Sequence, residues 1–352
     1  MIVERQIELL FRQDSQDAET HTNLSAVRRD VRCLWVAGDE TATIERLTEV
    51  TAADGTVTGY ADQATFALAD FVELPAGPDE EADIEGLASE GGWLWAIGSH
   101  SLKRKRIKDD QSDAKARKRL ATVVREENRY ILVRLPLETG PDGLPVPVRR
   151  AADGRTAAIL GGRGDSITDL LEHDPHVGPF LKIPSKDNGV DVEGVAVHGE
   201  RLYVGFRGPV LRGWAVLVEV WPETDPHDDG RLTLRRLNGL RYHTHFLDLD
   251  GLGIRDLCPE GDDLLILAGP SMALSGPVRL YRWRDAAVRE LPGIVREPEH
   301  VADLPHGDGE DHAEGVAVIG DGELLVVFDS PAKSRHTAAG GMLADVFVLP
   351  VK

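Results

Sequence analysis

The stretch that decides the fold is "DIEGLASEGGWLWAIGSH", residues 83–100, in which an acidic residue and a glycine precede two apolar runs joined by a Gly-Gly turn. Nearly the same phrase returns as "DVEGVAVHGERLYVGFRG", residues 191–208, and as "HAEGVAVIGDGELLVVFDS", residues 312–330. A looser copy, "DLDGLGIRDLCPEGDDLLILAGP", begins at residue 248. Self-similarity of this kind indicates a repeat architecture.

A fifth copy lacks the acidic residue. "LSAVRRDVRCLWVAGDE", residues 24–40, matches the first copy when Trp35 is aligned with Trp95, which places Ser25 at the position of Glu85. Each copy continues with a Gly/Asp turn, a second apolar strand and then more polar strands. This gradient is typical of a four-stranded propeller blade, because its innermost strand is buried and its outermost strand faces water.

The repeats predict an all-β protein: a single β-propeller domain over residues 1–352 with five four-stranded blades, six being the alternative. The last repeat shows three clear strands, so "IVERQIELLF", residues 2–11, is expected to add the fourth and close the ring. Insertions are expected at about residues 101–127 and 152–188. Each contains a short helical pattern, the first with Ser112 as its cap, and a sixth degenerate blade would lie in the same stretches.

Composition excludes several classes of protein. The chain has 60 acidic and 40 basic residues among 352, a net charge of −20, which argues against general binding of nucleic acid or anionic membranes. Cys33 and Cys258 fit neither a disulfide framework nor a paired metal motif. The amino-terminal segment has no signal-peptide pattern, and no apolar run approaches the roughly 20 residues of a membrane helix. A soluble, cytoplasmic protein is expected.

Four carboxylates fall in register when the copies are aligned on their acid-glycine pairs. Because the first strand of each blade runs beside the propeller channel, we expect these side chains to meet at one channel mouth. Their repulsion must be offset by a cation or by basic side chains, and oxygen-only ligands suit calcium or magnesium. Alternatively, each pair only caps a turn. The predicted metal ligands are Glu85, Glu193, Asp250 and Glu314.

The ends of the second strands differ in charge from copy to copy, as a ligand site built from several blades requires. Arginine suits the bidentate binding of phosphate or carboxylate. The alternative is that these arginines pair with the channel acids as a structural network. The predicted ligand-binding residues are His100, Lys103, Arg104, Arg207, Arg212, Arg255, Asp256, Asp329 and Arg335.

Two stretches bring histidines close to one another or to acidic residues, and the second overlaps the start of the last repeat. His243 and His245 in "YHTHF" have the spacing of one strand face, and "HGDGEDHAEG", residues 306–315, gathers histidines and acids. Neither has a zinc-site signature, so both are expected on the surface. No G-x-S-x-G motif occurs, so no catalytic residue is assigned, and any catalysis is expected to use a metal-activated or carboxylate-activated water.

In combination, "EGLA" with "LWAIGSHS", "VEGVAVHGERLYVGFRG", "LDGLGIRDL" and "LVVFDSPA" resemble the bacterial family designated domain of unknown function 3616, from about Leu24 to the end of the chain. The resemblance implies a β-propeller related in shape to phytase-like esterase propellers, in which a channel calcium is common. It implies no activity, because fold does not fix function.

Three functions follow from these observations. The first is the binding of a small anionic ligand or a protein partner at the polar channel face. The second is metal-assisted hydrolysis of a phosphoester or related ester, with the channel acids holding the ion and with Arg207, Arg255 and His100 holding the substrate. The third is a purely structural interaction module.

Overall fold

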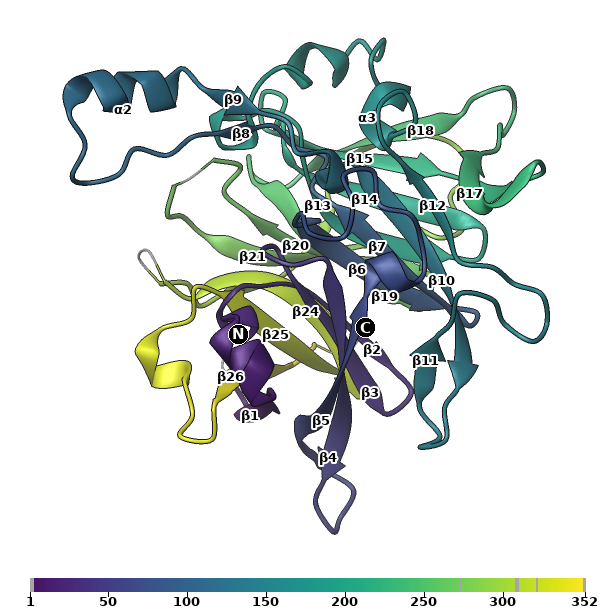
Figure 1. Cartoon of the computed structure of the whole chain (residues 1–352), viewed down its shortest axis with the longest axis vertical. Helices are drawn as coiled ribbons and strands as arrows, with labels where there is room; N and C mark the ends of the chain where they lie inside the picture. The colour runs from purple at the N-terminus through teal and green to yellow at the C-terminus, as the bar shows by residue number, and fades with distance from the viewer. Residues whose placement is uncertain (1–2, 273, 308–309, 321, 351–352) are drawn as a thin grey trace.

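The computed structural model describes residues 3–272, 274–307, 310–320 and 322–350. The protein is all-β, and most of its strands follow a repeated unit of four antiparallel strands, each of which we call a sheet (Figure 1). The first and last of these units are joined edge to edge into one eight-stranded sheet. The first sheet is β2 (Leu24–Asp30), β3 (Cys33–Gly38), β4 (Thr43–Thr51) and β5 (Val57–Ala67); the second is β6 (Ile84–Glu90), β7 (Trp93–Gly98), β10 (Ile131–Thr139) and β12 (Ala158–Gly161).

Two further sheets repeat the same arrangement. The third is β13 (Asp191–His198), β14 (Arg201–Gly208), β15 (Trp214–Val220) and β18 (Tyr242–Asp248); the fourth is β19 (Gly253–Glu260), β20 (Asp263–Gly269), β21 (Val278–Trp283) and β23 (Glu299–Leu304). The second strands are mostly buried, as in β3, whereas the last strands β5, β18 and β23 carry exposed positions. The predicted polarity gradient is present in these sheets but not in the second, whose last strand β12 is buried at every position.

The fifth sheet combines the two ends of the chain. It consists of β24 (His312–Gly320), β25 (Glu323–Asp329), β26 (Gly341–Val348) and β1 (Arg5–Leu10). The strand β1 pairs antiparallel with β26 and also pairs in parallel with β5 of the first sheet. The predicted amino-terminal strand thus forms, although Ile2 lies outside the described residues.

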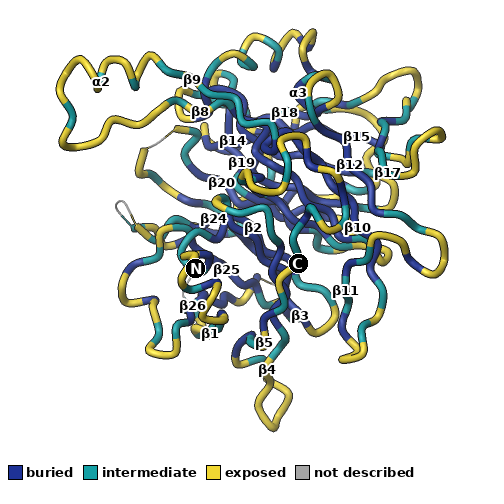
Figure 2. Tube along the Cα trace, in the orientation of Figure 1, coloured by how far each residue is buried: buried dark blue, intermediate teal, exposed yellow. Residues whose placement is uncertain are grey.

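The first strands of the sheets form a closed ring. In order, β2 contacts β6, β6 contacts β13, β13 contacts β19, β19 contacts β24, and β24 contacts β2. An apolar core fills the space between each pair of consecutive sheets. Figure 2 shows the buried strands gathered at the centre and the exposed loops around them. This arrangement is propeller-like.

Short elements connect the sheets or extend their edges. They are α1 (Gln13–Asp17), α2 (Asp113–Leu120), α3 (Ile167–Leu170), β8 (Lys103–Arg104), β9 (Val123–Val124), β11 (Pro145–Pro147), β16 (Pro222–Asp225), β17 (Asp228–Leu234) and β22 (Ile294–Val295). The two predicted helices correspond to α2, which follows Ser112, and α3, which Ser166 and Asp169 cap reciprocally. Within the described residues, every helix is too short or too polar to cross a membrane.

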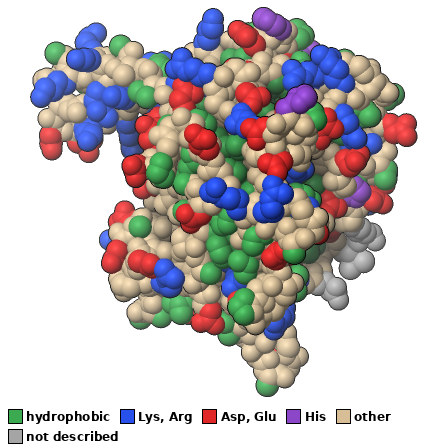
Figure 3. All heavy atoms as spheres, turned by 45° about the vertical axis from the view of Figure 1, so that its right-hand side comes forward, with side chains coloured by type: hydrophobic (Ala, Val, Ile, Leu, Met, Phe, Trp, Pro, Cys, Tyr) green, Lys and Arg blue, Asp and Glu red, His purple; other side chains and the backbone are tan. Residues whose placement is uncertain are grey.

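Residues 103–124, called here the basic arm, project from the body of the protein (Figure 1). The helix α2 within the arm has no buried residue. Nine basic residues face three acidic ones over residues 103–119, and Figure 3 shows Lys and Arg side chains crowded on the arm. At its base, Arg104 Nε bonds Asp187 at 2.8 Å and Lys103 Nζ bonds Glu81 at 3.1 Å.

Candidate functional site

A β-bulge interrupts the first strand of every sheet. Its position explains why the repeats have a polar residue near the start of this strand. In each bulge the pairing with the second strand skips a residue, which re-aims the side chain of that residue. In β13 the bulge also skips Gly194. The skipped polar residues are Ser25, Glu85, Glu193, Arg255 and Glu314. We call the end of the ring where they lie the channel mouth.

The glycine that follows three of these residues allows neighbouring first strands to approach closely. A Cβ atom on Gly86 would lie 2.9 Å from the backbone nitrogen of Val195. At Gly194, with φ of +145°, it would lie 3.0 Å from the Cα of Asp256. The glycine is thus needed so that neighbouring strands can pack closely. The residue before it supplies the polar side chain at the channel mouth.

Asp250 is not part of the ring, so its predicted alignment is corrected. Asp250 and Gly251 form a turn ahead of β19, both with positive φ, a conformation that aspartate and glycine favour. The exposed Asp250 carboxylate accepts hydrogen bonds from Arg279 Nη1 at 2.7 Å and from the Tyr281 hydroxyl at 2.8 Å. Arg255 occupies the ring position instead.

Arginine and carboxylate side chains alternate along one side of the mouth. Arg207 pairs with both Asp191 and Glu193. Arg255 Nη1 lies 3.3 Å from Glu193 Oε2 and also pairs with Glu314. Because Arg207 and Glu193 are each only 3% exposed, neither charge is well hydrated, and each depends on the other for compensation. These pairs correspond to the predicted arginine network.

A second group of carboxylates lines what we call the acidic hollow, a cavity of about 260 Å³ beside this network. Arg129 compensates Asp83 by a direct ion pair. Glu85 has no ion pair among the described residues, and burial together with Asp83 and Glu193 raises its pKa well above the usual range. The hollow is lined by Asp39, Glu40, Glu81, Asp83, Glu85, Asp191, Ser101, Ser185, Lys103, Arg104, Arg129, Lys186 and Arg207.

Asp39 in the acidic hollow supports a prediction about pH. Burial, followed by the charges of Asp83 and Asp329, raises the pKa of Asp39 to about 7. The folded protein therefore binds more protons than the unfolded chain between about pH 4 and pH 7, and it loses stability as the pH rises through that window. We expect Asp39→Asn to raise the free energy of unfolding by about 1–2 kcal/mol at about pH 8 and to have little effect at about pH 4.

Urea denaturation of wild type and variant at both pH values measures this difference. Glu40→Gln, at the exposed neighbouring position, serves as the control and should change stability by less than about 0.5 kcal/mol. An Asp39→Asn variant that is less stable than wild type at about pH 8 would mean that the ionised carboxylate makes a favourable contact.

On the other side of the arginine network lies what we call the basic hollow, a cavity of about 440 Å³. Two of its cations, Arg207 and Arg255, are fixed by the carboxylates described above. The other two are Lys186 and Arg106, and neither forms an ion pair within 4.0 Å among the described residues, although the Lys186 charge acts on the nearby Asp191 and Glu193. The charged lining is Arg106, Lys186, Arg207, Arg255, Glu314 and Asp329, with His306 and His312; the apolar lining includes Pro270, Met272, Leu274 and Val278.

Three metal-ligand side chains meet in the wall of the basic hollow. One ligand atom from each of His312, Glu314 and Asp329 lies within 4.8 Å of the other two. His312 Nδ1 is 3.8 Å from Asp329 Oδ2, and the nearby Asp329 carboxylate raises the pKa of His312. Of the four predicted metal ligands, only Glu314 belongs to such a group within the described residues.

Four predicted ligand residues line neither hollow: Asp256, described below, and His100, Arg335 and Arg212. His100 is 2% exposed, its Nδ1 bonds the Gly98 carbonyl at 2.9 Å, and burial lowers its pKa to about 4. Arg335 bonds both oxygens of Asp345, at 2.8 and 2.9 Å, and holds the fifth sheet together. Arg212 lies on an exposed turn with φ of 52°.

Asp256 faces the centre of the ring, where a residue not predicted from the sequence joins it. Arg28 Nη2 lies 3.3 Å from Asp256 Oδ1 and donates to the Leu257 carbonyl at 2.6 Å. Its other nitrogens donate to the carbonyls of Leu87, at 2.9 Å, and Val316, at 3.3 Å. One arginine of β2 thus bonds β6, β19 and β24.

Of the remaining predicted ligand residues, Lys103, Arg104 and Arg207 line the acidic hollow, and Arg207, Arg255 and Asp329 line the basic hollow. Lys186 and Arg106 were missed, because inserted segments carry no repeat signal that would place them. Asp83 and Asp191 could have been found, because both stand two residues before the acid-glycine pair in the quoted copies.

Comparisons with known proteins show the family and several similar structures. A family model described as "Protein of unknown function (DUF3616)" matches residues 23–345. No curated protein matches the chain. Similar solved structures are the glutaminyl cyclase of Myxococcus xanthus, at 12% identity, covering 99% of this chain and 97% of that one with a TM-score of 0.43, and the PQQ-bound aldose sugar dehydrogenase of Streptomyces coelicolor, at 12% identity, covering 98% of each chain with a TM-score of 0.35.

The phage phi92 endosialidase is also similar, at 9% identity, covering 99% of this chain and 69% of that one with a TM-score of 0.40. These similar structures are β-propellers. At such identities and scores they carry no inference about ligand or activity.

Proposed function

This chain belongs to the family of proteins of unknown function designated DUF3616, and we propose from its geometry that it binds a small organic anion in the basic hollow at the channel mouth. The observation that carries the proposal is the convergence of four cations from separate segments on one cavity of about 440 Å³. A cavity of this size, with apolar walls and a few fixed polar groups, suits a small organic molecule.

The charges in the basic hollow favour an anion over a cation. Arg207 and Arg255 are already bound by carboxylates, which hold their guanidinium groups in place. Lys186 and Arg106 add two charges without ion pairs among the described residues, so the cations outnumber the lining carboxylates, Glu314 and Asp329. A phosphate or carboxylate would complete this arrangement, because charge-assisted hydrogen bonds are the strong ones.

Calorimetric titration with inorganic phosphate and with p-nitrophenyl phosphate tests the proposal. We expect Lys186→Ala to weaken binding by about 10-fold to 100-fold, because it removes one charge-assisted hydrogen bond. Lys182→Ala is the matched control, since Lys182 is an exposed lysine of the same segment outside the hollow. Absence of binding by wild type, or equal affinities of the two variants, would contradict the proposal.

A metal-assisted hydrolase is the second candidate, favoured by the His312, Glu314 and Asp329 group in the wall of the same hollow. An ion there would lie beside the bound anion, where it can activate a water. The imidazole favours a transition ion such as zinc or iron over the calcium expected from oxygen-only ligands. Hydrolysis of p-nitrophenyl phosphate that requires added metal and is lost in Asp329→Asn supports this candidate; binding without turnover excludes it for this substrate.

The accompanying inference about the fold is that the five sheets are blades of one β-propeller domain over residues 1–352. Support comes from the closed ring of first strands and from the pairing of β1 with β26. The segment at about 101–127 is then an insertion within the second blade. The segment expected as an insertion at about 152–188 contains β12, the fourth strand of the second sheet, so only the part after β12 lies ahead of the third blade. The two segments supply Arg106 and Lys186 to the basic hollow.

A further inference from the structure

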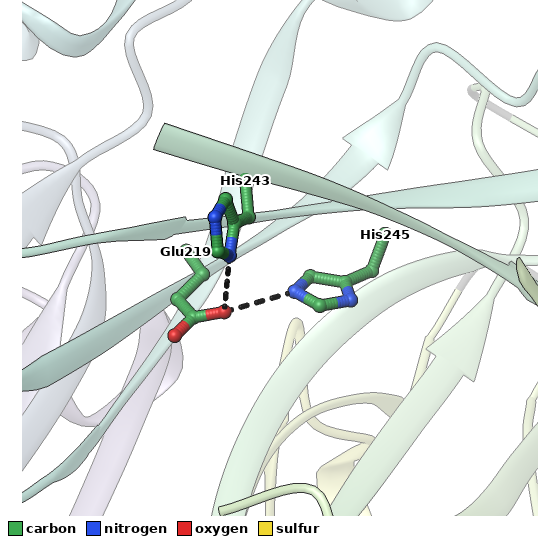
Figure 4. Close-up of side chains that lie close together, drawn as sticks. All are labelled: Glu219, His243 and His245. Carbon is green, nitrogen blue, oxygen red and sulfur yellow. Dashed lines mark hydrogen bonds and ion pairs between the residues drawn. The ribbon is translucent and has the colours of Figure 1, made fainter. Parts of the chain in front are cut away.

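A cluster of two histidines and a glutamate lies within the third sheet, away from the channel mouth (Figure 4). Glu219 on β15 is directly opposite His243 on β18, and His245, two residues along β18, points to the same face. The expectation that the histidines lie on the surface is wrong, since His243 is 3% and His245 1% exposed. They pack against Trp221 and Trp283, with ring centroids 4.8 and 5.0 Å apart.

The distances within the cluster match those between ligands of one metal ion. Glu219 Oε2 lies 3.1 Å from His245 Nε2 and 3.5 Å from His243 Nδ1. Tetrahedral zinc has bonds of about 2.0–2.2 Å to nitrogen and oxygen, which places its ligand atoms about 3.3 Å apart. The three atoms also lie within 4.8 Å of one another, so a single ion can contact all of them after small shifts.

One of the three ligand atoms has no hydrogen bond of its own. His243 Nδ1 is buried without a hydrogen-bond partner among the described residues, although it points toward Glu219 (Figure 4). Buried polar atoms are normally hydrogen-bonded, and each exception requires a cause such as an ion. The other oxygen of Glu219, Oε1, lies 3.5 Å from Arg201 Nη1. Such an outer partner orients a ligating carboxylate.

We propose that Glu219, His243 and His245 bind one divalent transition-metal ion, with zinc the best match, at a site separate from the basic hollow. Two imidazoles and a carboxylate are a donor set that suits zinc and disfavours calcium and magnesium. The ion would cross-link β15 to β18, the fourth strand of the third sheet, which pairs on its other side with the two-residue strand β22. The role of the bound ion would be structural, because Trp221 and Trp283 pack against the histidines and leave little room for a substrate.

Metal analysis of the full-length protein without a polyhistidine tag tests this site. All measurements use the His312→Ala variant as the background protein. This substitution removes one ligand of the group formed by His312, Glu314 and Asp329, so that zinc bound at the channel mouth does not add to the count. After incubation with zinc and dialysis, we expect about one zinc ion per chain by elemental analysis. Cobalt in place of zinc should give the visible absorption of a four-coordinate ion.

On this background, His245→Ala should weaken zinc binding by about 100-fold or more, because it removes a direct ligand. His300→Ala, which changes a half-exposed histidine on β23, is the matched control and should retain the zinc. No zinc in the folded background protein, or equal zinc in the His245→Ala variant, would overturn the proposal.

X-ray absorption at the zinc edge keeps the proposal testable if His245→Ala fails to fold. The background protein should show imidazole ligands together with oxygen. A zinc environment without imidazole would overturn the assignment to His243 and His245.

Discussion

Removal of residues 1–12 is expected to lower the free energy of unfolding by about 5 kcal/mol or more and to cause aggregation. Ile7, Leu9 and Phe11 are each 0–2% exposed, and burial of each such side chain stabilises by about 1.5–3 kcal/mol. The deletion also leaves β26 and β5 without their shared neighbour, so that two strand edges become open to other chains. Chemical denaturation and size-exclusion chromatography measure the two effects.

Single substitutions in the same strand sharpen this test. Leu9→Ala should cost about 2–5 kcal/mol, because Leu9 is fully buried. Glu8→Ala, one residue earlier and on the opposite face, should change stability by less than about 0.5 kcal/mol. A truncated protein that stays monomeric and melts as wild type does would show that β1 does not close the fold.

Replacement of Arg28 by methionine should destabilise the protein by about 3–5 kcal/mol. Arg28 is 5% exposed and Asp256 1% exposed, so removal of the arginine leaves a buried carboxylate without its counter-charge. Carbonyls of three other first strands also lose a donor. The urea concentration at the midpoint of unfolding should therefore fall by a large amount in the variant.

Two further variants distinguish this cause from a packing defect. Arg29→Met removes the adjacent arginine, which is partly exposed and pairs with Glu49 at 2.9 Å, and should cost about 0–1 kcal/mol. The double variant Arg28→Met with Asp256→Asn should recover part of the loss, because asparagine is neutral and can still accept from the backbone N–H of Val316. Equal destabilisation by Arg28→Met and Arg29→Met would show that the contacts of Arg28 with the other first strands do not stabilise the protein.

The repeats were readable in the sequence because each pairs a period-two apolar pattern with a fixed turn. This sufficed for most of the strands, including β1, and for four ring positions, Ser25, Glu85, Glu193 and Glu314. It missed β12, which lies inside the insertion expected at about 152–188. The alignment was wrong at Asp250, because an Asp-Gly turn has the same residue types as the acid-glycine pair of the other repeats but a different backbone conformation. The bulge that aims Arg255 into the ring has no signature of its own in a single sequence.

The side chains that complete the candidate sites were harder to predict. Lys186 reaches the basic hollow from an inserted segment, where no repeat fixes its position. Alternation in "YHTHF" correctly placed His243 and His245 on one face, but it could not tell which face the fourth sheet covers. Burial by a neighbouring sheet is a tertiary effect that the local pattern does not contain.

The pairing of Arg5 with Val346 across the fifth sheet has a consequence for synthesis on the ribosome. At a translation rate of about 5–20 residues per second, β26 is made roughly 20–70 s after β1. During that interval Ile7, Leu9 and Phe11 have no β26 to cover them, while the four sheets between can already assemble. The nascent protein therefore carries an apolar amino-terminal strand that chaperones can bind, and this strand enters its sheet only when the last strand emerges.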